Sequence, residues 1–150
     1  MMKVLAIGML FVANSAMAAD WSGTWSGTAT ATQNGESQEV QETVTLTQSE
    51  TVFTLVESVF GWETSYTVQG QDLYVGDVKV GSYNDSTFSV AFTVASEDAT
   101  CKQTYTVTRD NNNVKFLDDY TCDNDQYVKV EGTLAPAPAQ AIVKSNKAKL

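Results

Sequence analysis

Apolar and polar residues alternate with a period of two along most of the chain between Trp25 and Leu134. This period is typical of β-strands with one buried face, whereas the spacing of three to four residues that marks an amphipathic helix is almost absent. The alternation predicts about ten strands, at residues 25–32, 38–47, 52–59, 64–69, 72–75, 78–83, 87–94, 102–109, 114–121 and 126–134. The sequence therefore predicts an all-β domain.

The junctions between these strands carry residues that favour tight turns, among them Asn34-Gly35, Gly76-Asp77 and the run Asn111–Asn113. Connections this short join antiparallel neighbours. A meander of about eight to ten strands with one apolar face loses its exposed edges when it closes. We therefore predict an antiparallel up-and-down β-barrel, with a β-sandwich as the alternative.

The hairpin around the asparagine run has a register that can be derived from its apolar residues. The register that pairs Val107 with Phe116 also pairs Cys101 with Cys122. These are the two cysteines of the chain, so we predict a disulfide that joins the strands where their hairpin opens. Closing a loop of this size contributes on the order of 3 kcal/mol to stability.

A second hairpin, around Ser49-Glu50, brings two carboxyl groups together. The register that pairs Val44 with Leu55 places Glu42 opposite Glu57, with both side chains facing inward. Opposed carboxylates in a low-dielectric interior share a proton, or bind a cation or a polar ligand. The alternative is a bulge that turns Glu57 outward, because a second apolar set lies on the other face of its strand.

The apolar residues of three further hairpins predict their registers in the same way. We predict Leu73 opposite Val80, Val80 opposite Val90, and Phe116 near Leu134. Small residues occupy the inward positions of the first strand after Trp25, and they either leave a cavity or allow a tight crossing of strands. These small residues are Gly27, Ala29 and Ala31.

The first 19 residues have the features of an export signal. Lys3 supplies a positive charge, Val4–Val12 form an apolar stretch too short to span a membrane, and Ala16-Met17-Ala18 supply the small residues before a cleavage site. We predict cleavage after Ala18 or Ala19, a barrel domain at 20–134 and a disordered, Lys-containing Ala/Pro tail at 135–150. The periplasm or the extracellular space would suit the disulfide.

The chain is acidic, with 18 Asp and Glu against 9 Lys and Arg and a net charge of −9. Such a surface repels phosphate backbones and anionic headgroups, so we expect no nucleic acid and no membrane as partners. A basic protein, such as a lysozyme or a protease that this protein would inhibit, fits the charge better. The alternative is that the charge keeps a monomer soluble.

Several classes of chemistry are excluded by composition. The chain has no histidine, which removes Ser-His-Asp and Cys-His catalysis and most zinc sites. The acidic residues around Cys122 lack the spacing and the glycine of a calcium loop, and the glycines lie at turns rather than in a phosphate loop. We therefore predict a non-enzymatic protein without cofactor or metal. Glycoside hydrolysis by Glu42 and Glu57 is a weaker alternative.

The segment Gly23-Thr24-Trp25 opens the first strand. A Gly-x-Trp at the head of an exported antiparallel barrel resembles the calycins, the group that contains lipocalins and avidins. The resemblance covers this tripeptide and the architecture, and the helix that follows the barrel in lipocalins has no counterpart here. It implies that Trp25 packs at the closed end of the barrel, covered by Arg109, and that the barrel is a cup for a small, mostly apolar molecule.

We predict that five side chains bind this ligand. The carboxyl pair would hold a polar group of the ligand. Trp62 and Tyr66 lie on the same face of a short strand as Val68, where they would line a pocket or belong to the core. The predicted ligand-binding residues are Glu42, Glu57, Trp62, Tyr66 and Phe88.

Overall fold

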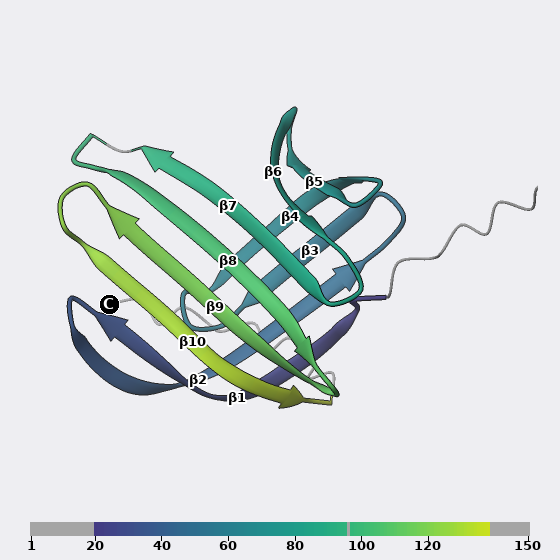
Figure 1. Ribbon diagram of the computed structural model, residues 1–150, viewed down its shortest axis with the longest axis horizontal. Helices are drawn as coiled ribbons and strands as arrows, with labels where there is room; N and C mark the ends of the chain where they lie inside the picture. Colours follow the sequence, from purple (N-terminus) through teal and green to yellow (C-terminus); the bar gives the residue numbers. More distant parts are fainter. Residues whose placement is uncertain (1–19, 96, 139–150) are drawn as a thin grey trace, which may run out of the picture.

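The structure, a computed structural model, describes residues 20–95 and 97–138, which form a closed barrel without helices (Figure 1). The strands are β1 (Gly23–Gln33), β2 (Glu36–Gln48), β3 (Val52–Glu57), β4 (Trp62–Gln69), β5 (Asp72–Val75), β6 (Val78–Tyr83), β7 (Thr87–Ala95), β8 (Thr100–Asp110), β9 (Asn113–Cys122) and β10 (Tyr127–Pro136). Each pairs antiparallel with its neighbours in sequence, and β1 also pairs with β10. The predicted meander barrel is confirmed, and the sandwich alternative is excluded.

The turns of the barrel alternate between its two ends, because consecutive strands run in opposite directions. We call the end with the β2–β3, β4–β5, β6–β7 and β8–β9 turns the plugged end. The other end, with the β1–β2, β3–β4, β7–β8 and β9–β10 turns, is the open end, whereas the β5–β6 hairpin bends away from the barrel (Figure 1). None of the described residues belongs to a helix that is long and apolar enough to cross a membrane.

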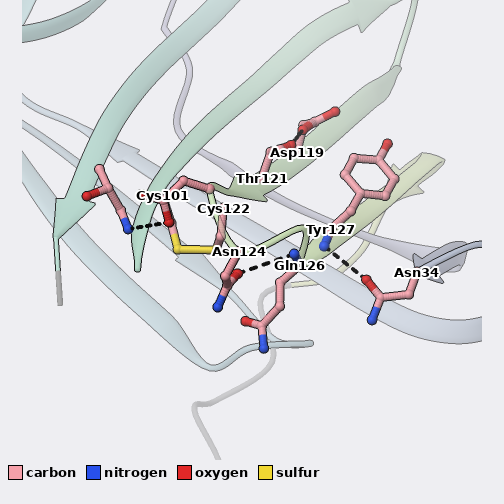
Figure 2. Close-up of a disulfide and its surroundings, with 10 residues drawn as sticks. Asn34, Cys101, Asp119, Thr121, Cys122, Asn124, Gln126 and Tyr127 are labelled. Atoms are coloured by element: carbon pink, nitrogen blue, oxygen red, sulfur yellow. Dashed lines mark hydrogen bonds between the residues drawn. A yellow bond between two sulfur atoms is a disulfide. The ribbon is translucent and has the colours of Figure 1, made fainter. Parts of the chain in front are cut away.

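The β8–β9 hairpin has the predicted register. Val107 pairs with Phe116 and Cys101 with Cys122, and a disulfide joins the two cysteines across the strands (Figure 2). Both cysteines are 6% exposed, and they lie at the open end of the barrel. The bond therefore fastens two adjacent strands where their hairpin opens.

Replacing the disulfide with Cys101→Ser and Cys122→Ser should lower the free energy of unfolding by about 3 kcal/mol, because the unfolded chain regains the freedom of the closed loop. Urea denaturation of the oxidised protein and the double variant measures this loss. A reductant should lower the stability of the native chain by a similar amount and leave the double variant unchanged. An equal midpoint for the two proteins would contradict this role of the bond.

Two other hairpins differ from their predicted register by two residues. In β2–β3, Leu46 pairs with Leu55 and Val44 with Glu57, so the predicted pairing of Glu42 with Glu57 is wrong. The last hairpin is shifted in the same way. A shift of two residues keeps every side chain on its face of the sheet, so the pattern that determines facing does not determine which of these registers forms.

A bulge changes the pairing of β6 by one residue. It lies between Leu73 and Tyr74, so Gly81 rather than Val80 lies opposite Leu73. The register of the β6–β7 hairpin also differs by one residue from the predicted one, and Gly81 lies opposite Val90. A Cβ at Gly81 would overlap the backbone oxygen of Ser89. This close approach of β6 to β7 explains why the position is a glycine.

Trp21, just before β1, fills the plugged end. It is fully buried, and its Nε1–H donates to the carbonyl oxygen of Asn84 at 2.7 Å. Its backbone N–H donates to Oε1 of Gln48 at 3.0 Å, and the guanidinium of Arg109 lies 4.4 Å from the centre of its ring. The resemblance implied that Arg109 covers Trp25, and the structure corrects this: the covered ring is that of Trp21.

Trp25 itself packs near the same end, as the resemblance implied. It is 8% exposed, and its Nε1–H donates to the carbonyl oxygen of Asn112 at 3.3 Å. A Cβ at Gly23 would lie 2.7 Å from its ring. The glycine of the Gly-x-Trp segment is therefore needed because the tryptophan ring lies against it.

The small inward residues of β1 divide into two groups. A Cβ at Gly132 of β10 would lie 3.1 Å from Cα of Ala29, and a Cβ at Gly27 would lie 3.4 Å from the side chain of Leu134. Here the small residues allow β1 and β10 to approach closely. Ala31, nearer to the open end, lines a hollow instead.

Strand β10 pairs with β1 as far as Pro136, two residues beyond the domain boundary predicted at Leu134. The predicted export signal at 1–19 and most of the predicted tail, residues 139–150, lie outside the described residues.

Candidate functional site

The open end of the barrel contains a hollow of about 460 Å³ between the β1–β2 hairpin, the β3–β4 turn and β10. Ala31, Val40 and Val59 form its inner wall and pack against the hydrophobic core. The aromatic ring of Phe60 and the side chain of Val128 add to the apolar wall. The rim is polar and comes from the tip of the hairpin: Thr32, Gln33, Asn34, Glu36, Ser37 and Gln38.

The hairpin that forms one wall of this hollow is fastened to β10. Asn34 has a positive φ of 50° and Gly35 one of 93°, which are the backbone conformations of a tight hairpin turn. The N–H of Asn34 donates to the carbonyl oxygen of Tyr127 at 3.0 Å, and the N–H of Tyr127 donates to Oδ1 of Asn34 at 3.1 Å (Figure 2). This reciprocal pair holds the rim in place.

A second, smaller space lies in the open half of the barrel. We call it the inner chamber, and its volume is about 20 Å³. Strands β3, β4, β7, β8 and β9 contribute its walls, and its lining combines aromatic with acidic and amide side chains. The lining residues are Leu55, Glu57, Trp62, Thr64, Tyr66, Phe92, Gln103, Tyr105 and Asp118.

Glu57 faces this chamber and is 4% exposed, so the predicted alternative of a bulge that turns it outward is wrong. Its Oε1 accepts hydrogen bonds from the N–H groups of Phe60 at 3.0 Å and Trp62 at 3.4 Å. Burial, and secondarily the charge of Glu42, raises the pKa of Glu57 to about 8. Glu57 therefore holds a proton at neutral pH.

Glu42 lies beside Glu57 on the same inward face and is 1% exposed. Its Oε1 accepts hydrogen bonds from the N–H of Thr43 at 2.7 Å and from the N–H and hydroxyl of Ser58, each at 2.9 Å. Its Oε2 has no partner among the N–H and hydroxyl groups of the described residues. The charge of Glu42, and a hydrogen bond between the two side chains, favour the protonated form of Glu57.

Asp118, on β9, is a third buried acid and is 3% exposed. Burial raises its pKa to about 6, although the hydrogen bond from Gln103 opposes the rise. Nε2 of Gln103 donates to both carboxyl oxygens, at 2.9 and 3.1 Å. The amide therefore fixes the orientation of the carboxyl group at the chamber wall.

Two polar atoms at the chamber have no hydrogen-bond partner among the described residues. They are the hydroxyl of Tyr105 and Oε1 of Gln103, whose residues are 3% and 5% exposed. Burial raises the pKa of Tyr105 and of Tyr66 well above the usual range, so both hydroxyls keep their protons at neutral pH. The chamber thus presents one free hydroxyl and one free amide oxygen beside its carboxyl groups.

The ion pairs of the described residues all lie on the surface and leave the three buried acids without a basic partner. They join Lys79 to Asp72, Lys115 to Asp110 and Lys129 to Glu131. In the same part of the chain, no group of three or more acidic or cysteine side chains is arranged to hold a metal ion. The interior of the open half is therefore an acidic environment without a compensating cation from these residues.

The structure brings together four of the five predicted ligand-binding residues. Glu57, Trp62 and Tyr66 line the chamber, and Glu42 adjoins it through Glu57. Phe88 lies elsewhere: it is fully buried in the core, with its ring stacked 4.7 Å from that of Phe53. It lines neither the hollow nor the chamber.

Six lining residues of the chamber are absent from that set, and for three of them, Gln103, Tyr105 and Asp118, the sequence contains a signal. The register that pairs Cys101 with Cys122 also pairs Tyr105 with Asp118, and Gln103 lies on the same face, between Cys101 and Tyr105. An inward-facing acid and amide beside the predicted carboxyl pair were therefore foreseeable.

No protein-family model matches the chain, and neither a curated protein nor a solved structure matches it.

Proposed function

We propose that this protein is an exported, non-enzymatic barrel that binds a small amphipathic molecule in the hollow at its open end. The observation that carries the proposal is the hollow of about 460 Å³. Small-molecule sites are concave spaces of roughly 300–1,000 Å³ with an apolar body and a few polar groups. The apolar inner wall and the polar rim support a ligand with an apolar part inside and a polar part at the mouth. A barrel with one plugged and one open end supports a calycin-like cup.

Export is part of the proposal. The buried disulfide between Cys101 and Cys122 is compatible with an oxidising compartment. The proposed cleavage after Ala18 or Ala19 would leave the contacts of the plugged end intact, because these begin at Asp20, whose carbonyl oxygen accepts a hydrogen bond from Arg109. Mass spectrometry of the protein recovered from the medium or the periplasm would test the cleavage site.

The carboxyl pair supports binding better than hydrolysis. Glycosidases hold their two carboxyl groups about 5–9 Å apart so that the sugar, and in some a water, fits between them. Glu57 lies close enough to Glu42 for a hydrogen bond between the two side chains, and it keeps its proton at neutral pH. We therefore expect Glu42→Gln to leave any glycosidase activity of a preparation unchanged.

Binding in the hollow is testable with a neutral apolar probe, N-phenyl-1-naphthylamine. We expect its fluorescence to rise and to saturate near one probe per chain. Val40→Trp should weaken binding at least tenfold, because the larger side chain fills the apolar wall of the hollow.

The matched control for this experiment is Val52→Trp, at an exposed valine by the β2–β3 turn of the plugged end. It should leave the affinity for the probe unchanged. Absence of saturable binding, or equal weakening by the two substitutions, would contradict the proposed site.

The acidic charge supports a second candidate, in which the protein binds and inhibits a basic protein. The chain carries twice as many acidic as basic residues, 18 against 9. Association through such a surface should be fast at low ionic strength and weaken steeply with added salt. Capture of hen lysozyme by the immobilised protein at low but not at high salt, with no uptake of the apolar probe, would favour this candidate.

A further inference from the structure

We propose that the inner chamber is a second binding site, separate from the hollow, and that it takes the primary ammonium group of a small organic amine. The unpartnered polar atoms, the charge, the size and the surroundings of the chamber each support this choice.

The unpartnered atoms of the chamber match the donors of an ammonium group. The amide Oε1 of Gln103 and the hydroxyl oxygen of Tyr105 are both buried acceptors without a partner among the described residues. A buried polar atom left without a hydrogen bond costs about 1–3 kcal/mol, so a ligand that supplies donors is favoured. An ammonium group has three N–H donors and no acceptor. With the carboxyl group of Asp118 as the third acceptor, every donor has a partner.

The charge of the chamber favours a cation. Glu57 and Asp118 line it, Glu42 adjoins it, and the ion pairs of the described residues involve none of the three. Charges in a low-dielectric interior interact several times more strongly than in water. A bound ammonium group compensates the negative charge that the surrounding protein leaves uncompensated.

The size of the chamber limits which cationic group can enter it. A volume of about 20 Å³ holds one group the size of a water molecule. A primary ammonium group has this size, whereas a guanidinium or a quaternary ammonium is several times larger. The rest of the ligand must therefore lie outside the chamber.

A break in the backbone pairing beside the chamber provides that space. Strand β4 pairs with β5 only at Thr67–Gln69, and β7 pairs with β6 only at Phe88–Val90. The β5–β6 hairpin bends away from the barrel, so the open-end halves of β4 and β7 have no strand between them (Figure 1). Side chains bridge this break: the rings of Tyr66 and Phe92 stack with centroids 6.0 Å apart.

The aromatic residues at the break suit an amine with a short apolar chain. Trp62, Tyr66 and Phe92 all line the chamber, and Trp62 is 40% exposed. The faces of aromatic rings attract cations and also pack against methylene groups. The chain of the amine would thus lie against Trp62 and Phe92, at the surface.

Proton release links this site to pH. The groups that face the chamber or adjoin it are Glu42 on β2, Glu57 on β3, Tyr66 on β4, Tyr105 on β8 and Asp118 on β9. Burial raises the pKa of Glu57 to about 8 and of Asp118 to about 6, while the tyrosines stay neutral. An amine therefore competes with protons for the carboxylates, and its affinity rises as the pH rises from 5 to 9.

The experiment is a titration of the full-length protein with n-butylammonium chloride at constant ionic strength, followed by the NMR signals of the Gln103 side-chain amide and the Trp62 indole. A primary amine keeps its proton at about pH 9, as a lysine side chain does. We expect saturable binding at this pH, at least tenfold weaker binding at about pH 5, and none of n-butanol, which has the same apolar chain without the charge. Equal binding of the alcohol, or equal affinity at the two pH values, would overturn the proposal.

Two variants identify the site. Asp118→Asn should weaken the binding of n-butylammonium at least tenfold at pH 9, while its control Asp119→Asn, at the next residue, should not. Tyr105→Phe removes one acceptor and conserves the ring, and it should weaken binding severalfold at every pH. Wild-type affinity in both chamber variants would place the bound amine outside the chamber and overturn the proposal. Uptake of N-phenyl-1-naphthylamine by the hollow should be unchanged in both, which separates this site from the proposed function.

Discussion

The free energy of unfolding should fall by on the order of 4 kcal/mol as the pH rises from about 4.5 to about 9. The folded protein keeps protons on Glu57 and Asp118 that the unfolded chain releases, because burial raises their pKa values from 4.5 to about 8 and from 3.8 to about 6. This contribution is fully present below the ordinary carboxyl pKa values. It is lost as the pH rises, first through the pKa of Asp118 and then through that of Glu57.

The size of the effect follows from the value of one pKa unit, about 1.4 kcal/mol. Both carboxyl groups lie near the surface break beside Trp62, where solvent screens part of the penalty for burying their charge. We therefore take about half of the free energy that the two full pKa shifts would give. Urea denaturation at about pH 5, 7 and 9 measures the slope.

The variant Glu57→Gln isolates the main contributor. A glutamine keeps the size of the side chain and carries no charge, so the stability of this variant should change little between pH 6 and 9. Glu63→Gln, at an exposed position of β4, is the matched control and should keep the wild-type slope. Stability that rises with pH in the wild-type protein would contradict the assignment of the proton to Glu57.

Strand positions, and facing in most strands, were predictable because both depend on local features of the sequence; β6 is the exception, since its pairing differs by one residue from the prediction. All ten predicted strands occur, each within three residues of its predicted ends. The β8–β9 hairpin also has the predicted register, because its short turn leaves little freedom and two independent signals, the cysteines and the pair Val107 with Phe116, agree. Where turn and side chains point to the same register, a hairpin is fully specified.

The register of a hairpin was not predictable where the alternation of apolar and polar residues was the only signal. Around Ser49-Glu50, the observed pairing of Leu46 with Leu55 and the predicted pairing of Val44 with Leu55 both place apolar side chains inward. The choice between them depends on the turn and on packing against the rest of the barrel. Glu42 and Glu57 are nevertheless both buried, as the predicted register implied, because both registers place the same side chains inward.

The chamber and the plugged end could not be predicted, because both depend on contacts between residues that are far apart in the sequence. The sequence does not show that β5 and β6 are too short to follow β4 and β7 to the open end, and this shortness creates the break beside Trp62. The role of Trp21 was missed for a related reason. It precedes the first strand, outside any alternating pattern, and its contacts with Asn84 and Arg109 bridge more than 60 residues of sequence.

Removing the plug should have an effect of similar size to the pH change. Trp21→Ala should lower the free energy of unfolding by about 4 kcal/mol, because a large buried ring is replaced by a cavity. Trp21 is fully buried, and the carbonyl oxygen of Asn84 would lose the hydrogen bond from its Nε1–H. The guanidinium of Arg109 would also lose the ring against which it lies. Urea denaturation at fixed pH measures the loss.

The same substitution at Trp62 provides a matched control, because the two tryptophans differ in burial and in the end of the barrel that they occupy. Trp62 is 40% exposed, so Trp62→Ala should cost less than about 1 kcal/mol. The effects on binding should be reversed: Trp62→Ala should weaken the binding of n-butylammonium, and folded Trp21→Ala should bind it as the wild type does. If both substitutions destabilised the protein equally, the ring of Trp21 would not be the structural plug. The contacts that stabilise the barrel would then not be concentrated at the end opposite the binding site.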